Sequence, residues 1–125
     1  MPYELSFTVP VTPADPGIYI NDCCWGGDVI RDRLLPAVSS NYDRVRTFQE
    51  DWGWGIWFRD GLTRLSVDIC CDDIANRKFR IRLTSCLARW FFFPTVIDTP
   101  ELERLRELIV PEVTAWAGPP VVDRD

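Results

Sequence analysis

The stretch Trp52-Gly-Trp-Gly-Ile-Trp-Phe58 holds three of the six tryptophans of the chain. It leads into Asp60-Gly61, a pair that typically forms a type I′ hairpin loop because both residues tolerate positive φ. With that loop, Trp57 would lie opposite Arg64. Side chains alternate along a strand, so the hairpin has one apolar and one polar face. The apolar set expected in the core is Trp54, Ile56, Phe58, Leu65 and Val67, and the opposite face carries Trp57, Arg64 and Ser66.

A second hairpin is predicted directly after the first, because residues 65–71 and 78–84 both alternate between apolar and polar side chains. Joining them through 73–77 brings unlike charges opposite each other on the polar face, which stabilises an antiparallel pair. Hydrophobicity and charge therefore select the same register. The expected pairs are Cys71 with Phe79, Ile69 with Ile81, Val67 with Leu83, Asp72 with Lys78, Cys70 with Arg80, and Asp68 with Arg82.

The remaining segments add strands on both sides of this meander. Residues 3–9 alternate as an edge strand, and the mixed pattern of 42–52 favours a strand with a bulge or an edge position. The expected strand order is 42–52, 53–59, 62–72 and 78–88, with 3–9 at an edge.

Two helices complete the predicted fold. The first is expected to use Asp28 as its N-cap, and the second to begin at Pro100 behind a cap at Asp98 or Thr99. We therefore expect an α+β fold, an antiparallel β-meander of about five strands with an N-terminal helix and a long C-terminal helix packed on one face. This outline is broadly similar, in architecture alone, to the secretion-chaperone-like class of binding proteins.

Composition limits both the organisation of the chain and its partners. The 125 residues are 46% hydrophobic, which is typical of one folded domain, expected over 1–118 and followed by a mobile tail over 119–125. A net charge of −5 disfavours a nucleic-acid partner. The basic side chains of 77–89 are balanced by nearby aspartates. Neither a signal peptide nor a transmembrane run is recognised, so a cytoplasmic, acidic protein without a membrane partner is predicted.

Residues typical of catalysis or metal binding are scarce. Without histidine, Ser–His and Cys–His pairs are impossible. Asp68 and Asp72 could form a carboxylate pair, but a cation opposite each would lower its pKa and leave an ordinary carboxylate. The five cysteines lack a C-x-x-C motif, which favours reduced, buried thiols over a zinc site or disulfides. We expect no cofactor and no metal, assign no catalytic residue, and regard an enzyme as the less favoured class.

Two surfaces are candidates for binding a partner. In a strand, the run 90–93 would direct two of its four aromatic rings away from the core, and Trp90 and Phe92 are the pair expected to be exposed. The leading prediction is a non-catalytic protein-interaction module of unknown partner, a homodimer, that uses either Trp90 and Phe92 or the face of Trp57 and Arg64. The alternative is a small-ligand-binding protein or enzyme with a pocket between sheet and helices, lined by Cys23, Cys24, Trp25 and Asp28.

Overall fold

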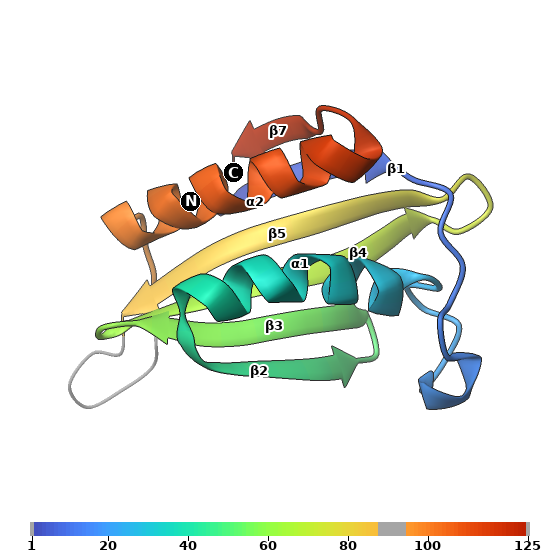
Figure 1. Ribbon diagram of the computed structural model, residues 1–125, viewed down its shortest axis with the longest axis horizontal. Helices are drawn as coiled ribbons and strands as arrows, with labels where there is room; N and C mark the ends of the chain where they lie inside the picture. The colour runs from blue at the N-terminus through green and yellow to red at the C-terminus, as the bar shows by residue number, and fades with distance from the viewer. Residues whose placement is uncertain (1, 88–94, 125) are drawn as a thin grey trace.

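The computed structural model describes residues 2–87 and 95–124. This part of the chain forms one antiparallel sheet in the order β2-β3-β4-β5-β1-β7, with β6 paired to β5. Both α-helices cover the same face of the sheet (Figure 1). The predicted α+β class is thereby confirmed. The elements are β1 (Tyr3–Thr8), a 3-10 helix η1 (Pro16–Ile18), α1 (Gly27–Asn41), β2 (Asp43–Glu50), β3 (Gly53–Asp60), β4 (Thr63–Asp73), β5 (Lys78–Leu87), β6 (Thr95–Val96), α2 (Pro100–Ala117) and β7 (Val121–Arg124).

The β3–β4 hairpin has the predicted faces but a different loop. Gly61 and Leu62 form the loop, so Trp57 lies opposite Ser66 and each predicted pair is displaced by two residues. Gly61 has φ +63° and Leu62 has no positive φ, which is the pattern of a type II′ turn with glycine first. A displacement of two residues leaves every side chain on its face. The predicted pairing was therefore wrong, whereas the predicted core face is confirmed.

The β4–β5 hairpin follows the predicted register along most of its length. Five of the six expected pairs are present, from Cys71 with Phe79 to Val67 with Leu83. The sixth is corrected by a bulge, which places Asp73 instead of Asp72 opposite Lys78. A bulge of this kind leaves one residue of a strand without a partner.

Strand β1 is an interior strand and not the predicted edge. It lies between β5 and β7, and Leu5 is opposite both Ile81 and Val122. The sequence predicts a mobile tail over 119–125, whereas the structure places 121–124 in the sheet. Four residues give too short an alternation to identify a strand, and the free edge of β1 supplies the pairing partner.

The helices begin close to the expected positions. In α2, Thr99 is the N-cap, and its Oγ1 accepts a hydrogen bond from the Leu102 backbone N–H at 3.1 Å. In α1, Gly26 is the N-cap at φ +99°, so the predicted cap Asp28 lies inside the first turn and is buried. The two helices bury Ile30, Leu34, Val38, Leu102, Leu105, Ile109 and Val113 against the inward residues of the sheet. The opposite face of β2–β5 carries the polar residues.

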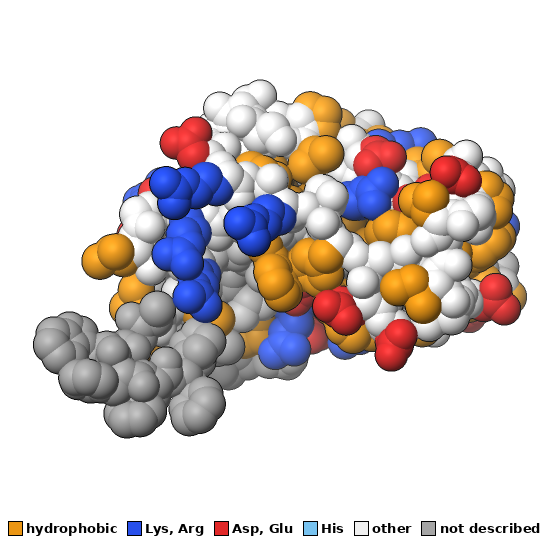
Figure 2. Space-filling view, turned by 90° about the horizontal axis from the view of Figure 1, so that it is seen from below, with side chains coloured by type: hydrophobic (Ala, Val, Ile, Leu, Met, Phe, Trp, Pro, Cys, Tyr) orange, Lys and Arg blue, Asp and Glu red, His pale blue; other side chains and the backbone are white. Residues whose placement is uncertain are grey.

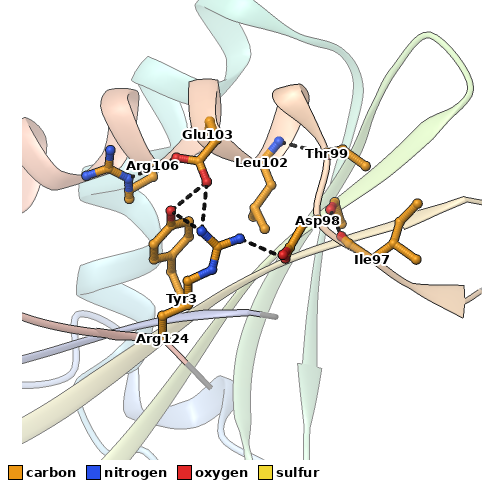
Figure 3. A network of polar contacts seen from close by, with 9 residues as sticks. Tyr3, Ile97, Asp98, Thr99, Leu102, Glu103, Arg106 and Arg124 are labelled. Atoms are coloured by element: carbon orange, nitrogen blue, oxygen red, sulfur yellow. Dashed lines mark hydrogen bonds and ion pairs between the residues drawn. The ribbon is translucent and has the colours of Figure 1, made fainter.

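A polar network joins β7 to α2 and β1 (Figure 3). Glu103 accepts hydrogen bonds from the Tyr3 hydroxyl at 2.5 Å and from Arg124 Nη1 at 3.2 Å. The Arg124 guanidinium also reaches Asp98 at 2.7 Å and lies 4.5 Å from the centroid of the Tyr3 ring. These contacts explain why a strand of only four residues is held in place.

The same network predicts a dependence of stability on pH. The hydrogen bond from Tyr3, with attraction from Arg124 and Arg106, lowers the pKa of Glu103 below its ordinary value of 4.5. A lowered pKa stabilises the fold above the unfolded value, and this contribution is lost as pH falls through the folded pKa. In urea titrations, Glu103→Gln should therefore lose stability at pH 7 but converge with the wild type as pH falls below 4.5.

Glu107→Gln is the control for that experiment, because Glu107 is an exposed residue of the same helix outside the network. Its free energy of unfolding at pH 7 should stay close to that of the wild type. A stability difference between Glu103→Gln and wild type that stays constant with pH would contradict the role assigned to Glu103.

Candidate functional site

A groove of about 730 Å³ lies on the sheet face opposite the helices. It runs across β2, β3, β4 and β5, and we call it the arginine groove. Figure 2, which views the molecule from the β2 side, shows basic side chains gathered beside hydrophobic ones. The lining residues are Arg44, Arg46, Trp57, Phe58, Arg59, Arg64, Leu65, Ser66, Asp68, Arg82, Thr84 and Cys86.

Trp57 supplies the largest apolar surface of the arginine groove. It is 51% exposed, and its ring packs on Phe48 with centroids 4.2 Å apart. Phe48 in turn lies over Gly55, where an added Cβ would come within 2.0 Å of Phe48 Cζ. Glycine at position 55 therefore allows the Phe48 ring to rest on the strand and to support Trp57 from the side.

Within residues 2–87 and 95–124, the five arginines of the groove form none of the salt bridges that several other arginines make. Salt bridges to carboxylates are formed elsewhere by Arg31, Arg80, Arg104, Arg106 and Arg124. Among the described residues, no carboxylate lies within salt-bridge distance of the groove arginines, which are all exposed: Arg44, Arg46, Arg59, Arg64 and Arg82. Their guanidinium groups remain available to a partner.

Two of these arginines are placed where their charges repel. Arg59 and Arg64 are directly opposite each other on β3 and β4. Like charges in this position destabilise an antiparallel pair. This pair was not predicted, because the predicted register placed Trp57 opposite Arg64, two residues away from the observed pairing. The surface beside the exposed Trp57 therefore carries two positive charges that repel each other.

Asp68 is the acidic residue in the lining of the groove. Its carboxylate accepts a hydrogen bond from the Ser66 hydroxyl at 2.6 Å and lies opposite Arg82. Burial raises the pKa of Asp68, although the Ser66 hydrogen bond and Arg82 act in the opposite direction. The expectation of a lowered pKa was therefore wrong for Asp68, because it neglected the desolvation of the strand face. Asp72 instead contacts Arg80 Nε at 3.5 Å.

Four of the five cysteines have a pKa raised by burial, and this favours the neutral thiol over the nucleophilic thiolate. All five cysteines are free. In the described ranges, no group of three or more cysteine, aspartate or glutamate residues has the arrangement of a metal site. The absence of zinc remains a prediction, which elemental analysis of the purified protein would check.

Two of the four residues of the alternative pocket, Trp25 and Asp28, contact Tyr19. The Trp25 ring packs on Tyr19 at 4.6 Å, Cys24 is buried and Cys23 is exposed. Asp28 accepts hydrogen bonds from the Tyr19 hydroxyl at 2.5 Å and from the backbone N–H groups of Ala14 and Asp15. The carboxylate of Asp28 is thus used to hold the chain that precedes α1. The contacts described here do not support a ligand at this place, and the alternative pocket therefore remains a prediction.

The sequence identified Trp57 and Arg64 but did not connect them with the other groove arginines. Arg44 and Arg46 lie on edge strand β2, next to a bulge where Arg44 has φ +56°. Both causes considered for the mixed pattern of 42–52, a bulge and an edge position, are present. The other predicted pair, Trp90 and Phe92, lies outside the described residues.

No family model, curated protein or solved structure matches the chain. The function is therefore argued from the geometry and chemistry of the groove. Among the described residues, no helix combines the length and apolar character needed to cross a membrane.

Proposed function

We propose that the protein is a non-catalytic protein-interaction module that binds its partner in the arginine groove. The observation that carries this proposal is the combination of exposed Trp57 with five exposed arginines, none of which forms a salt bridge with a carboxylate of the described residues. Tryptophan and arginine are the residue types most enriched at the energetic centres of protein interfaces. A cytoplasmic location and a homodimer remain predictions from the sequence.

The chemistry of the groove supports binding better than catalysis. Asp68, its acidic residue, is hydrogen-bonded to Ser66, and burial raises the pKa of the Cys86 thiol. General acid–base catalysis by carboxylates typically uses two of them with separated pKa values. The described residues of the groove lining contribute one carboxylate and therefore do not form such a pair.

The test is a comparison of the proteins captured from a lysate of the native organism. Trp57→Ala should lose partners that the wild type retains, because the ring forms the apolar centre of the groove. Leu62→Ala is the matched control, since Leu62 is an 83% exposed apolar residue on the same hairpin outside the groove lining. Capture of the same proteins by wild type and Trp57→Ala would contradict the proposal, provided that circular dichroism shows both to be folded.

A further inference from the structure

The geometry points to an acidic polypeptide segment as the occupant of the arginine groove. This inference rests on the proposed function and adds the chemical class of the partner. Of the described residues, five arginines and one aspartate line the groove, although the whole chain has a net charge of −5. The positive charge is thus concentrated on one face of an acidic molecule. Complementary charge across an interface directs encounter and selects the partner.

The groove arginines are suited to carboxylates. A guanidinium presents planar donors that match a carboxylate in a bidentate geometry. Arg59 and Arg64 are opposite each other on β3 and β4, so an anion between them would remove their mutual repulsion. Trp57 lies on the same face and offers an apolar surface to the side chains that separate the acidic residues of a segment.

The edge of the sheet is less suited to this partner than its face. Strand β2 is the edge next to the groove, and a bulge between Asp43 and Arg46 interrupts its pairing. Bulges and charged side chains are features that protect edge strands from the addition of another strand. The segment is therefore expected to bind through its side chains on the sheet face.

A nucleic acid is the rival polyanion, and the charge distribution favours the peptide. Single strands combine stacking on aromatic rings with a continuous positive track for the phosphates. Outside the groove, the arginines of β5 and α2 are paired with carboxylates, for example Arg80 with Glu4 and Arg104 with Asp60. A phosphate backbone that extends beyond the groove would meet an acidic surface. A peptide can confine its acidic residues to the groove.

The probe for the test is a fluorescein-labelled deca-glutamate peptide, with a labelled ten-residue deoxythymidine oligonucleotide as the rival. Fluorescence anisotropy should show peptide binding to the wild type that weakens between about 50 and 300 mM salt, because added ions screen exposed charges. Arg64→Glu should weaken peptide binding by about tenfold. The new carboxylate faces Arg59, so this variant replaces a repulsive pair and is expected to stay folded.

Lys78→Glu makes the same change of charge on β5 outside the groove lining and should bind the peptide as the wild type does. Asp68→Asn removes the acidic residue of the lining and should tighten binding by about threefold. Absence of peptide binding, equal affinity of wild type and Arg64→Glu, or tighter binding of the oligonucleotide would each overturn the inference. If the peptide fails while Trp57→Ala still loses its partners, the protein-binding proposal stands and only the acidic class is wrong.

Discussion

Asp28→Asn is expected to lower the free energy of unfolding by about 3 kcal/mol, because a buried and fully hydrogen-bonded carboxylate is replaced by an amide. Asp28 is 1% exposed. Its Oδ2 accepts from the Ala14 N–H at 3.0 Å and the Asp15 N–H at 3.3 Å, and its Oδ1 accepts from the Tyr19 hydroxyl. An asparagine must direct its NH₂ group at one of these donors and leaves that donor unsatisfied.

The measurement is urea unfolding followed by tryptophan fluorescence. Asp32→Asn is the matched control on the same helix, since Asp32 is exposed and pairs with its neighbour Arg31. Its loss should be within about 0.5 kcal/mol, as for most exposed ion pairs. Equal midpoints for the Asp28 variant and the wild type would mean that the segment before α1 is not held by this carboxylate.

Gly53→Ala is the second substitution with a large expected effect. Gly53 lies at the start of β3 opposite Cys70, where an added Cβ would be 2.0 Å from the Ile69 carbonyl oxygen. This atom belongs to the backbone of the neighbouring strand, so relief of the contact requires the two strands to separate. Overpacking of this kind should cost about 3 kcal/mol.

Gly53 also has a positive φ, of +155°, so Gly61→Ala serves to separate the effect of the clash from that of a positive φ. Gly61 has φ +63° and no atom within 4 Å of an added Cβ, so its replacement should cost only about 1 kcal/mol. Thermal or urea unfolding of the two variants gives the comparison. If both lost the same free energy, close approach of the Ile69 carbonyl could not be the reason for glycine at position 53.

The Asp28 network and the arginine groove are expected to serve different purposes, the first in stability and the second in binding. The network around Tyr19 and Asp28 lies at the start of α1, where buried polar groups satisfy one another. The groove lies on the opposite face of the sheet, where guanidinium groups are exposed. Substitutions in the first place should change stability, and substitutions in the second should change binding.

The pattern of side chains along each strand was enough to show which of them face the core. Alternation with a period of two is local, so Trp54, Ile56 and Phe58 could be assigned to one face before any pairing was known. It also determined most of the β4–β5 register, because unlike charges such as Asp68 and Arg82 limited the sliding that hydrophobicity alone permits.

The features that alternation leaves open depend on how the folded segments pack together. A slip of two residues preserves both faces, so the loop at Gly61 and Leu62 and the repulsive pair it creates were not predictable from the pattern. The place of β7 beside β1 depends on contacts between segments more than a hundred residues apart, such as Arg124 with Tyr3. The groove arginines come from four strands. The pattern within one strand does not show which arginines of the other strands will lie beside it.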